Sequence, residues 1–116
     1  MELSTLSASV YRFGSNVIPA IGFGTYKLTG ANGLQAIKHA LKIGYRLIDT
    51  AHLYDNEEIV GQAVRESISD GIIQSRDDVF ITTKLATVYH NPEHIPELIK
   101  VLLLYCAICL LLFCIK

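Results

Sequence analysis

The sequence predicts an α/β fold in which a short hairpin precedes a parallel sheet. Strand-like and helix-like segments alternate from residue 20 to residue 100, the order that joins parallel strands through right-handed helical crossovers. The strand-like segments are apolar on both faces, as in sheets that are covered on both sides. The chain has 116 residues, which allows one domain and is less than half of the roughly 250 that a complete (β/α)8 barrel needs.

The first predicted elements are a hairpin and a strand that contains two glycines. Residues 10–13 and 17–18 flank the turn sequence Gly14-Ser15-Asn16, which is typical of a hairpin. Pro19 follows at a position that needs no amide donor. Residues 20–26 form a short apolar run, which we interpret as a buried strand with close backbone contacts.

Two helices with a strand between them are predicted next. Residues 31–43 have apolar side chains at helical spacing, with Asn32 as the N-cap and Gly44 as the C-terminal stop. Residues 45–49 follow as a strand. We expect Asn56 to cap the second helix. That helix has an acidic first turn, an apolar stripe and a final glycine, supplied by Glu57, Glu58, Val60, Val64, Ile68 and Gly71.

A third strand and a third helix complete the alternating pattern. Residues 79–85 are rich in β-branched side chains and predict a strand. Asn91, Pro92 and Glu93 supply a cap, a proline at the first helical position and an acidic first turn, so we expect a helix to begin there. Pro96 lies slightly deep in that helix, which predicts an irregular start.

Two architectures fit this order of elements, a doubly wound sheet and a (β/α)8 barrel. A doubly wound dinucleotide-binding sheet carries Gly-x-Gly-x-x-Gly after its first strand. Here Gly22 and Gly24 are followed by Lys27 where the third glycine would stand. We therefore reject the doubly wound interpretation.

The charge and cysteine content exclude several classes of protein. The net charge is -1 and the isoelectric point about 6.4, so no electrostatic footprint for nucleic acid or an anionic membrane is present. Residues 1–9 are polar and lack the basic start and apolar core of a secretory signal, so we expect a cytoplasmic protein. The three cysteines, Cys106, Cys109 and Cys114, lie in the last 11 residues and do not form a disulfide framework.

Polar side chains follow the predicted strands at their carboxyl ends, where parallel α/β folds gather functional residues. Among them are Asp49, Tyr54 and Lys84. A lysine ammonium beside a tyrosine favours the phenolate, so the tyrosine becomes a better proton donor, and an aspartate can hold that lysine in place. Such a group suits protonation of a carbonyl oxygen as hydride arrives at carbon. The alternative is that Asp49 is a turn residue and Lys84 a solvated charge.

Four motifs resemble the aldo-keto reductase superfamily in sequence, order and spacing. They are Gly22-Phe23-Gly24-Thr25-Tyr26, Gly44-Tyr45-Arg46-Leu47-Ile48-Asp49-Thr50-Ala51, Tyr54-Asp55-Asn56-Glu57 and Phe80-Ile81-Thr82-Thr83-Lys84-Leu85. The resemblance runs from about Arg12 to Leu98. It implies a (β/α)8 barrel closed at the bottom by the hairpin, of which this chain holds about three βα units. It also implies NADPH-dependent reduction of aldehydes and ketones to alcohols, without metal or flavin.

The resemblance implies three catalytic residues in this chain. Tyr54 would donate the proton, Lys84 would assist it and Asp49 would pair with Lys84. Together with Asp49, the first motif would border the nicotinamide half of the cofactor through Gly22, Phe23, Gly24, Thr25 and Tyr26. The superfamily's fourth catalytic residue is a histidine at the end of the fourth strand, and the last third of its barrel binds most of the cofactor's phosphate and adenine groups. We expect this chain to lack both.

The histidines are predicted to lie outside the catalytic group. We expect His52 and His90 to be loop residues, with a minor role for His90 in lining the substrate pocket. His90 and His94 are four residues apart, but two histidines without a third ligand do not predict a metal site.

The last part of the sequence differs in composition from the rest. Residues 101–115 are an unbroken apolar run between Lys100 and Lys116. We predict a partial barrel domain over residues 1–100 and an apolar tail outside the superfamily pattern over residues 101–116. The tail has three interpretations: a membrane anchor, although a span needs about 20 residues; a buried helix or strand pair that needs a partner; or unrelated sequence from splicing or a gene-model error, which we favour.

The functional expectation is an N-terminal portion of an NADPH-dependent oxidoreductase with a small carbonyl substrate. We expect it to be inactive and aggregation-prone by itself, and monomeric when completed. The alternatives are a non-catalytic isoform that attaches to a membrane or a partner, and a product without function. Membrane attachment is expected only through residues 101–115, and no nucleic-acid partner is expected.

Overall fold

A computed structural model describes residues 9–86, 91–106 and 112–113 of the chain. His90, Cys109, Cys114 and the polar N-terminal residues 1–8 lie outside these ranges. The strands are β1 (Val10–Phe13), β2 (Asn16–Pro19), β3 (Phe23–Gly24), β4 (Leu47–Asp49), β5 (Phe80–Thr83) and β6 (Leu112–Phe113). The helices are α2 (Gly30–Lys42), α3 (Glu57–Ser69) and α4 (Ile95–Cys106), with 3-10 turns η1 (His52–Tyr54) and η2 (Arg76–Asp78).

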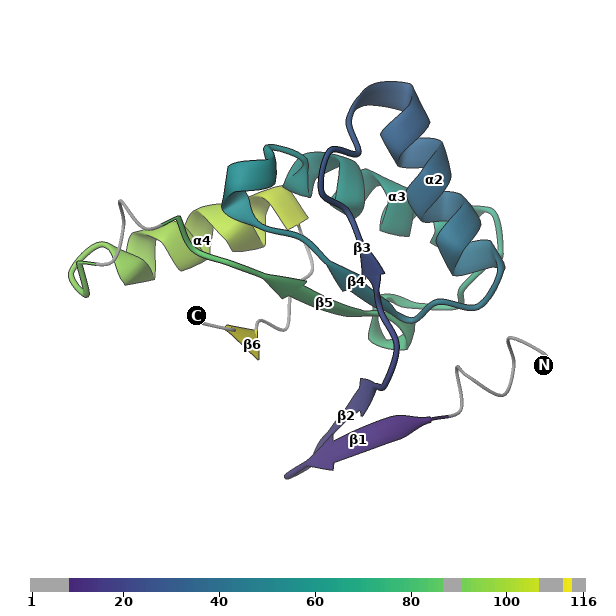
Figure 1. Ribbon diagram of the computed structural model, residues 1–116, viewed down its shortest axis with the longest axis horizontal. Helices are drawn as coiled ribbons and strands as arrows, with labels where there is room; N and C mark the ends of the chain where they lie inside the picture. The colour runs from purple at the N-terminus through teal and green to yellow at the C-terminus, as the bar shows by residue number, and fades with distance from the viewer. Residues whose placement is uncertain (1–8, 87–90, 107–111, 114–116) are drawn as a thin grey trace.

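The N-terminal hairpin forms as predicted. β1 and β2 pair antiparallel, from Val10 opposite Pro19 to Phe13 opposite Asn16. Gly14 adopts a positive φ of 59° in the turn between them, a conformation that glycine reaches without strain. Figure 1 shows the hairpin set apart from the rest of the sheet, below β3. The two strands therefore form a sheet of their own.

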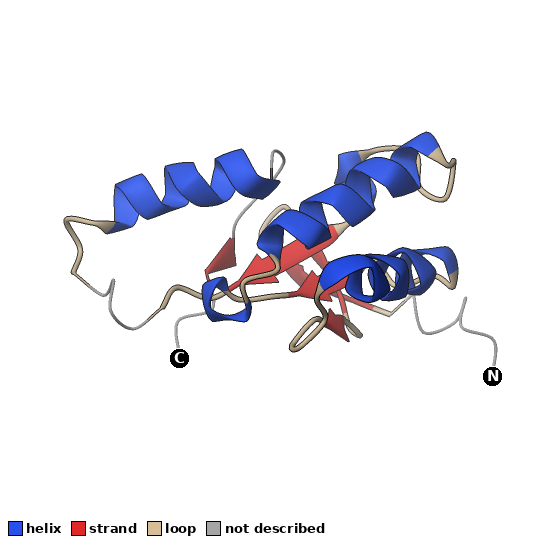
Figure 2. Ribbon diagram, turned by 90° about the horizontal axis from the view of Figure 1, so that it is seen from above, coloured by secondary structure: helices blue, strands red, loops and turns tan. Residues whose placement is uncertain are grey.

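The remaining strands confirm the predicted parallel α/β architecture. β3, β4, β5 and β6 lie side by side in chain order, and each neighbouring pair is parallel. α2 and α3 connect successive strands and contact each other, and α4 contacts α3. Figure 2 shows these helices gathered on one side of the strands. In the part of the chain that the structure describes, the result is an open four-stranded sector and not a closed barrel.

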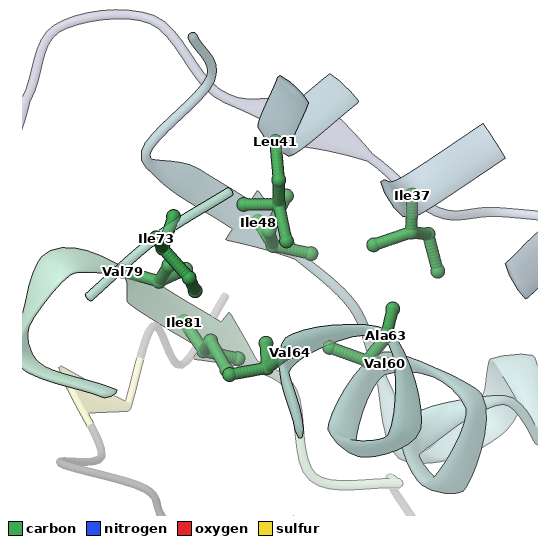
Figure 3. Packing of buried hydrophobic residues seen from close by; sticks show 9 residues of the cluster. All are labelled: Ile37, Leu41, Ile48, Val60, Ala63, Val64, Ile73, Val79 and Ile81. Atoms are coloured by element: carbon green, nitrogen blue, oxygen red, sulfur yellow. The ribbon is translucent and has the colours of Figure 1, made fainter. Parts of the chain in front are cut away.

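The hydrophobic core fills the space between the helices and the sheet. Nine buried side chains from α2, α3, β4, β5 and the segment between α3 and β5 converge there (Figure 3): Ile37, Leu41, Ile48, Val60, Ala63, Val64, Ile73, Val79 and Ile81. Burial of this apolar surface is the main force that holds α2 and α3 against the strands.

The sequence predicts strands that are apolar on both faces, and in the structure one face is buried more deeply than the other. In β4 the buried residue is Ile48, and in β5 the buried residues are Ile81 and Thr83. Asp49 and Thr82 belong to the other face and are half-buried. The helices cover only one side of this open sector, so alternate residues along each strand differ in burial.

Three predicted boundaries were wrong. The strand expected over residues 20–26 contains only Phe23 and Gly24, and Tyr26 is exposed. α2 has Thr29, not Asn32, at its N-cap position, because the amide of Gly33 already donates to the Thr29 carbonyl. α4 begins at Ile95, so Pro96 lies in its first turn, where a proline removes no helical hydrogen bond.

The C-terminal region continues the alternation of helix and strand. α4 runs through the predicted boundary at residue 100 to Cys106. β6 then pairs in parallel with β5, with Leu112 opposite Thr82. Within the described residues, no helix has both the length and the apolar content to cross a membrane.

Candidate active site

Two neighbouring strands bring the predicted catalytic residues to one end of the sheet. Asp49 is the last residue of β4, and Lys84 directly follows β5. Tyr54 closes η1, the turn that follows β4. Since β4 and β5 are parallel, with Asp49 opposite Thr82, their carboxyl ends meet at the same edge. The structure therefore brings Asp49, Tyr54 and Lys84 together.

The Lys84 ammonium lies at the centre of this group. Its Nζ is 2.6 Å from Asp49 Oδ2 and 3.5 Å from the hydroxyl oxygen of Tyr54. It also donates to the Thr50 carbonyl oxygen at 3.2 Å. The side chains of Asp49 and Lys84 are each 40% exposed, so the pair remains open to solvent and to a small ligand.

Opposing effects act on the pKa of Lys84. Partial burial, the largest of them, lowers the pKa because it disfavours the charged form. The hydrogen bond and negative charge of Asp49 raise it, as does the contact with Tyr54. The raising effects together exceed the lowering one, so the pKa of Lys84 lies above its ordinary value of 10.5. Lys84 is therefore a permanent cation at neutral pH.

Backbone hydrogen bonds hold the turn that carries Tyr54. The amide of Thr50 donates to the Thr82 carbonyl at 2.8 Å, and the amide of His52 donates to the Lys84 carbonyl at 3.0 Å. The Tyr54 amide closes the turn on the Ala51 carbonyl at 2.9 Å. These bonds extend the β4–β5 pairing past the strand ends, so η1 is fixed relative to Lys84.

The Tyr54 ring lies between a cation and a second aromatic ring. Lys84 Nζ is 5.2 Å from the centre of the ring, within the range of a cation–π contact. The ring of Tyr26 is tilted by 55° against it, with 5.1 Å between the ring centres. Tyr26 is 65% exposed, so the two rings form one wall of an open site.

The structure separates the predicted cofactor-bordering residues into two groups. Gly24 lies opposite Asp49, and a Cβ added to it would meet no atom within 4 Å, so this stretch of backbone is open. Tyr26 is exposed beside it. In contrast, Thr25 is fully buried and donates to the Asp49 carbonyl oxygen at 3.0 Å.

Phe23 and Gly22 are placed away from the open edge. The ring of Phe23 packs edge-on against Tyr45, 5.6 Å between centres, and borders the hydrophobic core. A Cβ on Gly22 would lie 2.7 Å from Cγ of Leu47, so Gly22 allows a close approach between chain segments.

Sequence reasoning missed one direct partner of Asp49. The Thr82 hydroxyl donates to Asp49 Oδ1 at 2.6 Å, so each oxygen of the carboxylate has its own donor from the β5 chain. Thr82 precedes Lys84 by two residues, and the period of two along a strand places both side chains on one face. That spacing was the signal that could have identified Thr82.

Two of the histidines discussed above, His52 and His94, lie among the described residues. His52 lies in η1, with Nδ1 3.5 Å from Glu57 Oε2. His94 is exposed, and His90 lies outside the described residues. Across those described residues, no cluster of three or more metal-ligating side chains occurs.

The arrangement can deliver a proton to a neighbouring oxygen. The Tyr54 hydroxyl lies 3.5 Å from the Lys84 ammonium, which would stabilise the negative charge that remains on the oxygen after proton transfer. Asp49 neutralises and orients the ammonium, and Thr82 fixes the carboxylate.

Comparisons with known proteins test the resemblance in sequence and fold. The family model of the Aldo/keto reductase family matches residues 20–106. Human "Aldo-keto reductase family 1 member C3" is 46% identical over 79 residues, which cover 66% of this chain and 24% of the human protein. The "NAD(P)H-dependent D-xylose reductase" of Candida tenuis is 40% identical over 80 residues, 69% of this chain and 24% of that enzyme.

A solved structure of an aldo-keto reductase has a similar fold. The Bombyx mori aldo-keto reductase in complex with NADP superposes with a TM-score of 0.78 and 31% identity, over 88% of this chain and 35% of that one. This chain thus spans about a quarter of the length of the curated relatives it matches. Sequence motifs, parallel sheet and family model agree, and the chain belongs to the aldo/keto reductase family.

Proposed function

We propose that this chain supplies the proton-donating part of an NADPH-dependent carbonyl reductase. The observation that carries the proposal is the Lys84 ammonium, 2.6 Å from Asp49 and 3.5 Å from the Tyr54 hydroxyl at the open end of the sheet. The names of the relatives support the same reaction class, since one is a reductase that uses NAD(P)H and another was solved with NADP.

Within this proposal, Tyr54 donates its hydroxyl proton to the carbonyl oxygen of a small aldehyde or ketone. Lys84 stabilises the phenolate that remains, and Asp49 keeps the ammonium in place. When bound, NADPH supplies the hydride that adds to the carbonyl carbon. General acid catalysis of this kind contributes about 10²- to 10⁴-fold to the rate.

The residues at the strand ends leave room for the flat nicotinamide ring of the cofactor beside Tyr54. Gly24 leaves its stretch of backbone open, and Tyr26 offers an exposed aromatic face. We assign Gly24, Tyr26 and Asp49 to the nicotinamide side of the site. Thr25 is buried and does not face the proposed ring, but its hydroxyl donates to the Asp49 carbonyl oxygen and so helps to hold Asp49 in place.

A hybrid enzyme tests the role of Tyr54. Residues 9–86 of this chain would replace the aligned segment of the Candida tenuis D-xylose reductase, whose remaining sequence completes the protein. We expect the hybrid to oxidise NADPH with D-xylose, and Tyr54→Phe to lower kcat by about 10²-fold or more, because the proton donor is lost.

Tyr11→Phe in the same full-length hybrid is the matched control. Tyr11 is 69% exposed in the hairpin, far along the chain from the strand ends, so kcat should not change. An active hybrid that keeps its kcat after Tyr54→Phe would disprove the proposed role.

By itself the 116-residue chain is expected to consume NADPH with an aldehyde no faster than buffer. Its described strands form an open sector, so the site is exposed to water on the side away from the helices. Turnover above the buffer rate that disappears with Tyr54→Phe would show that this sector is sufficient for catalysis.

A further inference from the structure

Asn56 stands at the N-cap position of α3, but its side chain makes no capping hydrogen bond. Asparagine at this position ordinarily accepts a hydrogen bond from an amide of the first helical turn. The residue is also only 1% exposed. A buried amide is almost always hydrogen-bonded, so the partners of Asn56 indicate what it does.

The Asn56 side chain connects the end of β4 to the loop that follows β3. Its Oδ1 accepts a hydrogen bond of 2.7 Å from the Thr50 hydroxyl. Its Nδ2 donates to the carbonyl oxygens of Thr25 and Leu28, at 2.7 and 3.0 Å. Thr25 and Thr50 are fully buried, so the contacts with these two residues lie in a protected environment, and the contact with Leu28 is partly buried.

The two carbonyl groups held by Asn56 bracket Tyr26. Between them, Lys27 adopts a positive φ of 62°, which is uncommon for a residue other than glycine. A loop with this conformation depends on contacts from its surroundings. Tyr26 is the residue whose ring lies 5.1 Å from the ring of Tyr54, and Tyr54 precedes Asn56 by only two residues.

We propose that Asn56 is a positioning residue that sets the contact between Tyr26 and Tyr54, and thereby the direction in which Tyr54 presents its hydroxyl group. The proposal rests on the proposed role of Tyr54 as proton donor. Asn56 acts through the loop and does not touch the reacting atoms. Its side chain matches the task because one acceptor faces Thr50 and two amide hydrogens face two carbonyl oxygens.

The test measures the ring contact in the full 116-residue chain, with neither cofactor nor substrate present. Nuclear Overhauser cross-peaks between the rings of Tyr26 and Tyr54 would be recorded for the unmodified chain and for Asn56→Ser. Serine is also a favoured N-cap residue, so α3 keeps its start, but its hydroxyl is too short to reach both carbonyl groups. We expect the cross-peaks to be lost while circular dichroism retains the helical signal.

Val64→Ala separates positioning from a general loss of stability. Val64 is fully buried in the core on α3, so its truncation leaves a cavity but removes none of the hydrogen-bond partners of Asn56. We expect Val64→Ala to lower Tm and to keep the cross-peaks. Loss of the cross-peaks in Val64→Ala, or wild-type cross-peaks in folded Asn56→Ser, would overturn the proposal.

Asn56→Asp provides a second variant of nearly the same size. The carboxylate still accepts from Thr50 but presents negative charge to the carbonyl oxygens of Thr25 and Leu28, so the ring contact should again be lost. If both Asn56 variants fail to fold while Val64→Ala folds, Asn56 is a stability residue and the proposal is wrong.

Different experimental results would disprove the proposed function and the positioning role of Asn56. A hybrid enzyme that stays active with Tyr54→Phe removes the proposed function, whatever the cross-peaks show. Unchanged cross-peaks in Asn56→Ser remove the positioning role, whatever the hybrid shows.

Discussion

At the residue scale, the carboxylate of Asp49 depends on donors from a single neighbouring chain segment. Thr82 and Lys84 each bind one of its oxygens, at 2.6 Å in both cases. The two donors differ in kind, since one is a neutral hydroxyl and the other a cation. Their contributions can therefore be separated by substitution and by pH.

The Thr82→Val variant tests the neutral donor. It keeps the shape of the side chain but removes the hydroxyl that donates to Asp49 Oδ1. Because the group is half-buried, we expect the free energy of unfolding to fall by about 1 kcal/mol, measured by urea denaturation. Thr82→Ser retains the hydroxyl and serves as the control. A loss of stability in Thr82→Ser with none in Thr82→Val would show that the methyl group, and not the hydrogen bond, is responsible.

The raised pKa of Lys84 predicts how its contribution to stability changes with pH. The folded state holds the proton more tightly than the unfolded state, so the contribution is fully present below the ordinary pKa of 10.5. It is lost as the pH rises through the higher pKa of the folded state. The difference in unfolding free energy between the chain and Lys84→Met should be constant from about pH 7 to about pH 9 and shrink above about pH 10.5.

Because both side chains of the ion pair are 40% exposed, that difference should not exceed about 1 kcal/mol. A difference that instead grows with rising pH would contradict a folded-state pKa of Lys84 above its ordinary value.

At the scale of single elements, α2 is held against the loop after β3 by a close backbone contact. A Cβ added to Gly33 would lie 2.7 Å from the carbonyl carbon of Leu28. This atom belongs to the backbone, so it cannot move aside by a rotamer change. The same loop carries Tyr26, which couples the packing of the helix to the wall of the site.

We therefore expect Gly33→Ala to destabilise the protein, although alanine is the better helix former by about 1 kcal/mol. The clash should lower the free energy of unfolding by about 1–3 kcal/mol in thermal or urea denaturation. Asn32→Ala, at an exposed position in the same turn, should instead raise it by up to about 0.7 kcal/mol. Stabilisation by both substitutions would show that the Leu28 contact can relax.

At the scale of the whole molecule, the described part of the chain is an open sector whose outer strands each pair on one side. β3 pairs with β4 and β6 pairs with β5, and no other described strand joins the four. Open strand edges present unpaired amide and carbonyl groups that can pair with another chain. Several apolar side chains near the hairpin and β3 are also exposed, including Val10, Val17 and Ile21.

We expect the isolated 116-residue chain to associate as its concentration increases, and light scattering or sedimentation would measure this as a rising mean mass. Ile21→Lys, which puts a charge beside β3, should reduce association, because charges on edge strands disfavour pairing. Leu53→Lys is the matched control, since Leu53 is 73% exposed but lies in η1 and not beside an edge. If both variants reduced association equally, exposed apolar side chains in general, and not the edge at β3, would be its cause.

The sequence by itself determined the alternation of strands and helices and the three residues Asp49, Tyr54 and Lys84. Apolar periodicity and strand-end position are local properties, so the printed residues were enough to predict them. The parallel order of β3 to β6 confirmed the alternating α/β architecture, whereas the catalytic roles of the three residues stay predictions. The strand over residues 20–26 was predicted too long, because only Phe23 and Gly24 pair with β4. The cap at Asn32 was wrong, because the amide of Gly33 donates to the Thr29 carbonyl and the helix begins earlier.

Only the tertiary structure decided which partners the polar groups of the site have. Asn56 was predicted as a helix cap, but its amide binds Thr25 and Leu28, which lie 31 and 28 residues earlier in the chain. Thr82 became a partner of Asp49 through the register of two strands. Hydrogen bonds between distant segments depend on how the strands and helices pack in space, and composition, spacing and periodicity along one chain do not contain that information.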